Sequence, residues 1–173
     1  MSDALFIIDL AACVGCYACA IACKDRADLP DALDWLRVAE REGGRSPHPT
    51  LAYRVTHCFH CAQAPCFAVC PTGALAQRND GLTLLDAATC SGCGQCLATC
   101  PFEAIVMSPD GVASKCDACA DELDLGWEPT CVRACPSRAL DYGPLSEPWL
   151  THRRRDPEFD DRGIGPAVAY LRR

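Results

Sequence analysis

Residues 90–101 read CSGCGQCLATCP, in which four cysteines are separated by two, two and three residues and are followed by proline. Three further segments repeat this arrangement. Residues 13–23 have the same spacing without the proline, residues 58–71 have four residues in the middle gap, and residues 116–136 have eleven. The quartets use all 16 cysteines: Cys13, Cys16, Cys19 and Cys23 in motif one; Cys58, Cys61, Cys66 and Cys70 in motif two; Cys90, Cys93, Cys96 and Cys100 in motif three; Cys116, Cys119, Cys131 and Cys135 in motif four.

Disulfides, zinc or iron–sulfur clusters can explain thiols in this pattern. A disulfide framework belongs to oxidising compartments and has no reason to repeat a two-residue spacing. Structural zinc uses pairs of C-x2-C elements, whereas motifs one and three are triplets with a fourth cysteine three residues later. The run C-x2-C-x2-C-x3-C-P is the bacterial ferredoxin signature, in which the fourth cysteine binds a different cluster from the first three. The spacing therefore favours four [4Fe-4S] clusters with every cysteine as a metal ligand.

The composition indicates an interior filled partly by a cofactor. Leu, Val, Ile and Phe account for 35 of the 173 residues, which is low for a domain held by apolar packing alone. The net charge of −7 argues against a nucleic-acid partner, because phosphate binding requires a basic surface. No apolar stretch reaches the ~18 residues of a membrane span, and the N-terminus lacks the basic region of a secretory signal. We therefore expect a cytoplasmic protein without a direct membrane span, although such a subunit can also be exported with a signal-bearing partner.

Between the quartets the chain reads as short strands and hairpins. Residues 5–9 predict a strand that leads into motif one. Residues 74–85 predict a hairpin with an Asn-Asp-Gly turn, and residues 104–113 predict a second hairpin. The segment 25–50 is rich in charged residues, glycine and proline, and we expect it to be an excursion on the surface. Since two such units make a two-cluster ferredoxin lobe, four units imply two lobes.

The four motifs resemble, in order and spacing, those of the four-cluster electron-transfer subunits of dimethyl-sulfoxide-reductase-type molybdenum and tungsten oxidoreductases. The segments that resemble them, within residues 3–143, are CVGCYACAIACKD, CFHCAQAPCFAVCPTGAL, CSGCGQCLATCPFEAI, and KCDACADEL with PTCVRACPSRALD. The resemblance implies an α+β fold of two ferredoxin-like lobes, related by pseudo-symmetry and held by four [4Fe-4S] clusters. The outer lobe would comprise residues 1–24 and 114–143, the inner lobe residues 51–113, and residues 144–173 would form a C-terminal extension.

The resemblance also implies that the chain performs no substrate chemistry of its own. It would relay single electrons between a large molybdenum- or tungsten-pterin catalytic subunit and a second redox partner. The short chain favours a tungsten aldehyde oxidoreductase as host, in which a flavin subunit that reduces a nicotinamide would be a further partner. The alternatives are the iron–sulfur subunit of a formate hydrogenlyase-like or sulfur-compound reductase complex, and an iron–sulfur redox sensor.

By the same resemblance, motif one pairs with motif four and motif two pairs with motif three. In each pair the fourth cysteine of one motif binds the partner motif's cluster. The implied ligand sets are Cys13, Cys16, Cys19 and Cys135; Cys116, Cys119, Cys131 and Cys23; Cys58, Cys61, Cys66 and Cys100; and Cys90, Cys93, Cys96 and Cys70. Electrons are expected to pass through the clusters of motifs one, four, three and two in that order, with the motif-one end facing the catalytic subunit.

Two pairs of residues beside the cysteines are of interest. Lys24 and Lys115 are the only lysines and each adjoins a cysteine. Their ammonium groups either raise a cluster potential or help docking, or they merely offset thiolate charge. His57 and His60 flank Cys58, and either could be a ligand in a Rieske-like variant. Four thiolates are available to every cluster, however, so we expect these histidines to lie outside the ligand sets or on the surface.

The tail has mixed charge and contains three large aromatic or apolar residues, whose exposure to water is unfavourable. These are Trp149, Leu150 and Tyr170. They favour a tail that wraps around a partner subunit over one that is merely solvated.

Overall fold

The computed structural model describes residues 4–173 as a mixed α+β structure with short helices. The helices are α1 (Ala18–Arg26), α2 (Pro65–Ala68), α3 (Gln95–Thr99), α4 (Ala120–Asp124), α5 (Thr130–Arg133) and α6 (Glu147–Leu150). The strands are β1 (Ala4–Asp9), β2 (Arg37–Arg45), β3 (His48–Thr56), β4 (Leu75–Gln77), β5 (Thr83–Leu85), β6 (Ile105–Met107), β7 (Ala113–Lys115), β8 (Leu140–Pro144), β9 (Arg154–Arg155) and β10 (Val168–Arg172). No helix within residues 4–173 is long and apolar enough to cross a membrane.

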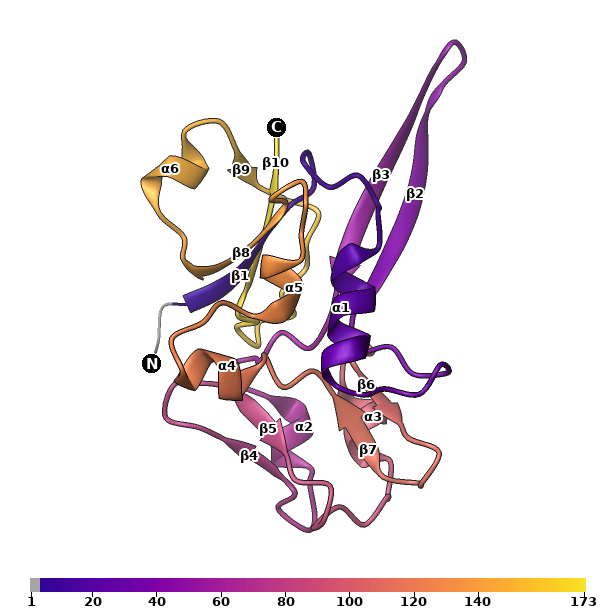
Figure 1. The fold of residues 1–173 in the computed structure, drawn as a ribbon, viewed down its shortest axis with the longest axis vertical. Helices are drawn as coiled ribbons and strands as arrows, with labels where there is room; N and C mark the ends of the chain where they lie inside the picture. The colour runs from indigo at the N-terminus through magenta and orange to yellow at the C-terminus, as the bar shows by residue number, and fades with distance from the viewer. Residues whose placement is uncertain (1–3) are drawn as a thin grey trace.

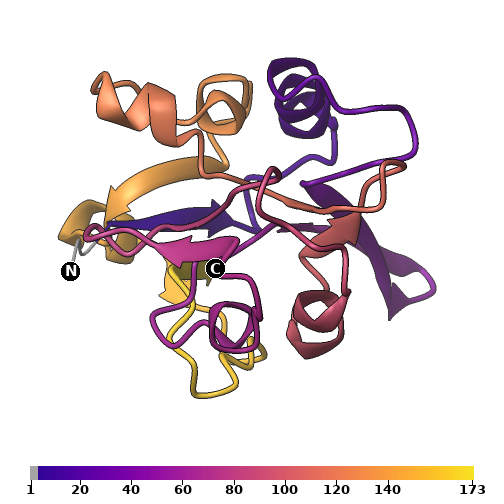
Figure 2. The same cartoon turned by 90° about the horizontal axis from the view of Figure 1, so that it is seen from below.

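The largest sheet joins segments from opposite ends of the chain. Its strand order is β8-β1-β10-β9, with β1 antiparallel to β8 and parallel to β10. Phe6, Ile7 and Ile8 are all buried, as expected for a central strand that is covered on both faces. Helices α1 and α5 lie side by side against this sheet (Figures 1 and 2). The strand predicted at residues 5–9 is therefore confirmed.

Two small hairpins form the other end of the molecule together with α2 and α3 (Figure 1). In the first, β4 pairs with β5 and Leu75 lies opposite Leu85. In the second, β6 pairs with β7 and Ile105 lies opposite Lys115. Both hairpins predicted from the sequence are confirmed.

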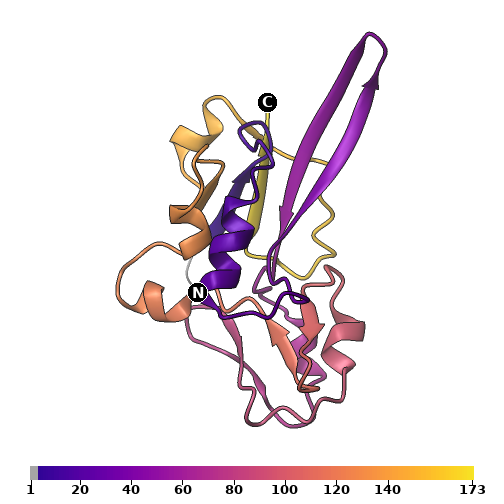
Figure 3. The ribbon, with the colours of Figure 1, turned by 45° about the vertical axis from the view of Figure 1, so that its right-hand side comes forward.

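A long ribbon of β2 and β3 projects from the body of the molecule (Figures 1 and 3). Its ladder runs from the pair Arg37 and Thr56 to the pair Arg45 and His48, and most of its residues are exposed. An isolated two-stranded ribbon is marginally stable in water. Its base is held by the Arg54 guanidinium, which lies 4.5 Å above the ring of Tyr170.

The prediction that the tail wraps around a partner is wrong for its last strands. β10 pairs with β1 along its length, and Tyr170 and Leu171 are 2% and 0% exposed. The Tyr170 hydroxyl donates a hydrogen bond to the Val55 carbonyl. Trp149 is also used within the chain, since its indole N–H donates to Asp141 Oδ2 at 3.0 Å. Tyr170 completes the chain's own core, whereas Leu150 stays 42% exposed. Local sequence pattern cannot distinguish packing within the chain from packing against a partner.

An aromatic cluster connects the two ends of the molecule. Phe59 is 2% exposed and its ring makes edge contacts with the rings of His57, Phe102, Phe159 and Tyr170. Aromatic pairs of this kind contribute roughly 0.5–1.5 kcal/mol each beyond the area they bury. Motifs two and three are thereby packed against the C-terminal segment.

We predict that Leu171→Ala lowers the free energy of unfolding by about 2–5 kcal/mol, because it creates a cavity at a fully buried position. Chemical denaturation of the cluster-loaded protein, followed by circular dichroism, measures this loss. Leu150→Ala is the matched control, since Leu150 is 42% exposed and the change should stay within about 0.5 kcal/mol. Equal effects of the two substitutions would contradict a structural role for β10.

Candidate iron–sulfur sites

Motifs two and three together form two groups of four thiols. Cys58, Cys61 and Cys66 line one small cavity with Cys100 of motif three. Cys90, Cys93 and Cys96 line another with Cys70 of motif two. Helix α2 packs against α3, and each helix leads to the fourth cysteine of its own motif. The packing of these two helices therefore brings each fourth cysteine to the other motif's loop.

Motifs one and four are interleaved in the same way, because α1 packs against α5. Burial, followed by the neighbouring Cys135 thiolate, raises the pKa of Cys19 to about 11. Burial and then the Cys119 thiolate raise the pKa of Cys23 to about 12. Cys131 is influenced most, after burial, by Cys119 and Cys23, and its pKa is also raised. The fourth cysteine of each motif thus lies among the thiols of the other.

All 16 cysteines are free, so the disulfide explanation is wrong. A tetrahedral zinc site would hold its sulfur ligands at about 2.3 Å from one metal ion. The thiols of motifs two and three instead gather in groups of four, each around a cavity that two motifs line together.

The residue before the second cysteine has the same unusual backbone conformation in all four motifs. Its φ angle is positive at Gly15 (66°), His60 (45°), Gly92 (69°) and Ala118 (59°). This left-handed conformation turns the C-x2-C loop sharply, and it is costly for a residue with a Cβ atom. The two glycines were visible in the sequence, whereas His60 and Ala118 gave no signal. Strain tolerated at equivalent positions is typical of a functional loop.

A second recurring geometry follows each Cys-Pro pair. The residue three positions after the cysteine has a positive φ in motifs two, three and four: Gly73, Glu103 and Arg138. The turn directs the next backbone N–H at the cysteine sulfur, with distances of 3.5 Å from Ala104 N to Cys100 Sγ and 3.2 Å from Ala139 N to Cys135 Sγ. Motif one lacks the proline, and there helix α1 continues to Arg26.

These donors stabilise the charged form of the sulfur. The backbone N–H of Leu75, with further help from the Thr72 hydroxyl, lowers the pKa of Cys70. At Cys135, burial acts in the opposite direction, but the Ser137 hydroxyl and backbone N–H groups bring its pKa below the usual value. Cluster ligands must be thiolates, and N–H or O–H donors at the sulfur satisfy that requirement. The residues present therefore fit [4Fe-4S] clusters. Sequence reasoning missed the hydroxyls of Thr72 and Ser137, although both stand two positions after a Cys-Pro cysteine.

The two histidines are buried rather than on the surface, and neither replaces a cysteine in a quartet. Burial lowers the pKa of His57 to about 4, and its Nδ1 lies 2.8 Å from the Cys58 carbonyl oxygen. His60 Nδ1 accepts a hydrogen bond from Thr83 N–H at 3.1 Å, so the ring proton lies on Nε2.

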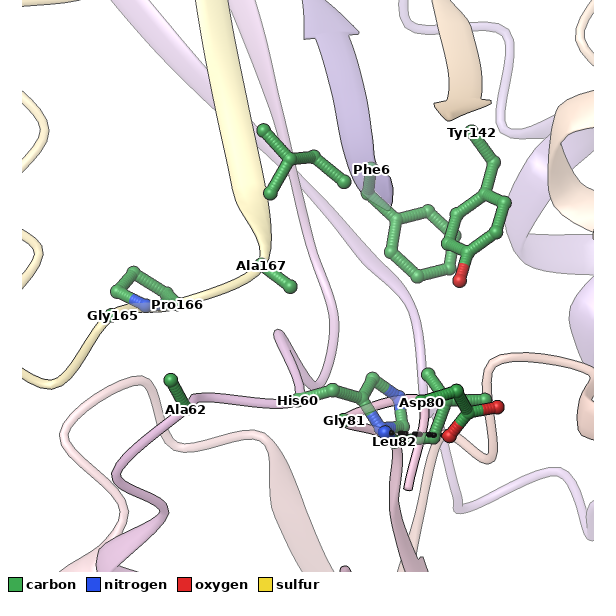
Figure 4. A pocket seen from close by; sticks show the side chains of 11 residues that line it. Phe6, His60, Ala62, Asp80, Gly81, Leu82, Tyr142, Gly165, Pro166 and Ala167 are labelled. Atoms are coloured by element: carbon green, nitrogen blue, oxygen red, sulfur yellow. Dashed lines mark hydrogen bonds between the residues drawn. The ribbon is translucent and has the colours of Figure 1, made fainter. Parts of the chain in front are cut away.

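His60 also borders a pocket of about 180 Å³ between β1, β8 and residues 165–167 (Figure 4). The walls are mostly apolar, with Phe6 and Tyr142 on one side. None of the quartet cysteines lines this pocket, so it is separate from the sulfur groups.

The two lysines differ in their surroundings. Lys24 Nζ donates to the Asp31 carbonyl and forms an ion pair with Asp34 at 3.0 Å. Lys115 is 3% exposed and donates to the carbonyl groups of Thr83 and Cys116. Both lysines adjoin a cysteine in the sequence, but Lys24 is ion-paired with a carboxylate, whereas Lys115 is buried and bonds to backbone carbonyls.

The expected order of the quartets is wrong at one step. Cys116 of motif four packs in one buried cluster with Cys58 of motif two and Ala104. The Cys58 thiolate also contributes, after burial and Cys23, to the raised pKa of Cys116. The quartet of Cys58, Cys61, Cys66 and Cys100 is thus the neighbour of motif four, and Cys100 also packs against this cluster. The physical reason is the path of β7. This strand of the β6–β7 hairpin ends at Lys115, so Cys116 follows it directly and lies beside Cys58 of motif two.

We predict that Gly92→Ala disrupts the motif-three loop and its cluster. A Cβ atom at Gly92 would lie 2.2 Å from the Gly111 carbonyl oxygen, which is backbone and cannot rotate away. Gly73→Ala is the matched control, because its φ of 70° is nearly identical and nothing lies within 4 Å of the added atom. The control should cost only about 1–2 kcal/mol of backbone strain. Iron content and thermal unfolding of both variants test this, and equal retention of iron would contradict the steric argument.

Comparison with known proteins identifies the family. A model of the 4Fe-4S dicluster domain matches residues 50–145, and a second model of the same description matches residues 12–74. The chain is 40% identical to the thiosulfate reductase electron transfer subunit PhsB of Salmonella typhi, over 78% of this chain and 72% of that protein. It is 38% identical to the B subunit of the anaerobic dimethyl sulfoxide reductase of Escherichia coli (82% and 74%) and 39% identical to the B subunit of the polysulfide reductase of Wolinella succinogenes (79% and 73%). The chain therefore belongs to the 4Fe-4S dicluster family of electron-transfer subunits, with 16 cysteines for four [4Fe-4S] clusters.

Proposed function

We propose that this chain relays single electrons between a molybdenum-containing catalytic subunit and a second redox partner. The observation that supports this best is the difference in burial among the four quartets, since burial is least in those of motifs one and three and greatest in that of motif four. Cys16 of motif one and Cys93 of motif three are exposed, whereas the cysteines of motif four are all buried. When bound, a [4Fe-4S] cluster accepts and releases one electron. A row with buried middle members and accessible ends is suited to conduction between two partners.

We infer the ligand sets from the grouping of the thiols. The sets are those expected from the family resemblance: Cys13, Cys16, Cys19 and Cys135; Cys116, Cys119, Cys131 and Cys23; Cys58, Cys61, Cys66 and Cys100; Cys90, Cys93, Cys96 and Cys70. The two cysteine-lined cavities support the last two sets, and the mutual electrostatic effects of the outer thiols support the first two. The order of relay would then be motif one, four, two and three.

The same grouping supports two ferredoxin-like lobes related by pseudo-symmetry. The recurring positive φ before the second cysteine, and after each Cys-Pro pair, argues for a repeated unit. The packing of α1 on α5 parallels that of α2 on α3. We propose residues 1–24 with 114–143 as the outer lobe and 51–113 as the inner lobe. Because β10 pairs with β1, residues 168–172 would also belong to the outer lobe.

The host complex is proposed from the relatives. The similar proteins belong to thiosulfate, dimethyl sulfoxide and polysulfide reductases, so a sulfur-compound or sulfoxide reductase is the favoured host. This is the alternative of the sequence analysis, and it replaces the tungsten aldehyde oxidoreductase as first choice. A flavin subunit and a cytoplasmic location stay predictions from the sequence alone.

We propose that the catalytic subunit docks at the motif-one end. Val14 and Ile21 are 61% and 66% exposed there, and a relay needs its terminal cluster close to the partner. The β2–β3 ribbon is attached to the same end, because the Tyr17 hydroxyl donates to Glu40 at 3.2 Å. A partner that covers Ile21 would also contact the ribbon.

The ligand sets predict which pairs of substitutions damage a single cluster. Each of Cys58→Ser, Cys90→Ser and Cys100→Ser should reduce the iron content by about four atoms when its cluster is lost. Combining Cys100→Ser with Cys58→Ser should cause no further loss, because both changes affect one cluster. Combining Cys100→Ser with Cys90→Ser should remove about eight iron atoms. The reverse pattern would show that the fourth cysteine stays with its own motif.

The function predicts a complex with the catalytic subunit and fast electron exchange within it. Anaerobically reduced protein, mixed with the molybdenum subunit and its oxidised sulfur substrate, should regain the visible absorbance of oxidised clusters. Ile21→Glu should weaken the complex at least about tenfold because it buries a charge at the interface. Leu125→Glu, at a residue 69% exposed beside α4, is the matched control and should bind normally. Absence of both complex and reoxidation for the unmodified protein would contradict the proposed function.

A further inference from the structure

Lys115 is a buried cation without a carboxylate partner. It is the last residue of β7 and is 3% exposed. Its ammonium group donates to the backbone carbonyl of Thr83 on β5 and, at 2.7 Å, to that of Cys116. None of the described carboxylates forms an ion pair with it.

The two carbonyl groups position Lys115 between the two buried quartets. Thr83 lines the cavity that Cys58, Cys61, Cys66 and Cys100 surround. Cys116 belongs to the motif-four quartet and packs against Cys58. The ammonium group is therefore held at the junction where motif four of the outer lobe meets motif two of the inner lobe.

Burial of an unpaired ammonium group is expensive, so a countercharge is expected nearby. Backbone carbonyls solvate the group but do not neutralise it. The thiolates of the two quartets can supply this negative charge. Consistent with this, burial and the Cys58 thiolate raise the pKa of Cys66, while Lys115 is the largest influence that lowers it.

We propose that Lys115 acts as a fixed positive charge that raises the reduction potential of the motif-two cluster and so favours electron transfer between the two lobes. This inference rests on the proposed electron-transfer function. The added electron is stabilised by the ammonium group across a water-poor junction, where effective dielectric constants are far below that of water. No bond forms or breaks, and only an electron moves. Lys115 is a positioning residue for charge, not a ligand.

Redox titration of the four-cluster protein, monitored by electron paramagnetic resonance, tests the proposal. In Lys115→Gln and Lys115→Met, reduction of one cluster should become at least about tenfold less favourable, which corresponds to 59 mV for a one-electron couple. Lys115→Arg keeps the charge and should retain the original potential within a few-fold. Lys24→Gln is the matched control, because Lys24 also adjoins a cysteine but is ion-paired with Asp34 near the surface.

Each outcome separates this inference from the proposed function. Unchanged potentials in a fully loaded Lys115→Gln protein would overturn the role of Lys115 and leave the relay intact. An unmodified protein that lacks four reducible clusters would instead overturn the proposed function. If both neutral variants fail to retain clusters while Lys115→Arg retains them, the charge is required and the proposal stands. Failure of Lys115→Arg as well would assign Lys115 a packing role and overturn it.

Discussion

The structure depends on the requirement to hold 16 cysteine sulfurs, ten of them on buried residues, in a charged, metal-binding state. A thiolate in the interior is stable only where hydrogen-bond donors and a metal compensate its charge. The chain turns sharply before the second cysteine of each motif, where φ is positive at Gly15, His60, Gly92 and Ala118. Backbone N–H groups also point at the sulfurs of Cys100 and Cys135. The chain has few large apolar residues, and cysteines make up much of the buried interior that such residues fill in other domains.

This requirement also accounts for the form of the rest of the molecule. Helices α1 to α5 have four to nine residues, which is too short to be stable alone, and each of them lies within or beside a cysteine motif. The small hairpins β4–β5 and β6–β7 close the loops between cysteines, and Lys115 extends from the end of one to a carbonyl of the other. Without the metal, the buried thiols whose pKa values are raised would stay protonated, whereas cluster ligands must be thiolates, and the material that fills the space between the quartets would be missing. We therefore regard cluster binding and folding as one equilibrium.

The strands that contain no cysteine, β2, β3, β9 and β10, are held by contacts between side chains and by strand pairing rather than by the quartets. The β2–β3 ribbon projects from the motif-one end, while β9 and β10 return to the central sheet. Arg54 at the base of the ribbon joins the two, since it contacts both Tyr170 and Asp156. The accessible motif-one loop, the ribbon and the C-terminal segment thus form one continuous end of the molecule, opposite the end that contains motif three.

The sequence by itself determined the chemistry and much of the local structure. The cysteine spacing indicated iron–sulfur clusters, and the short apolar segments with their turn residues indicated β1 and both small hairpins, because these features depend on residues close together in the chain. Only the tertiary structure decided the pairing of β10 with β1, the contact of Cys116 with Cys58, and the burial of Lys115. Each of these depends on segments that meet from distant parts of the chain, for which local spacing has no signal. The positive φ of His60 and Ala118 was likewise not indicated by the sequence, because neither residue type favours this conformation. The surrounding loop imposes it.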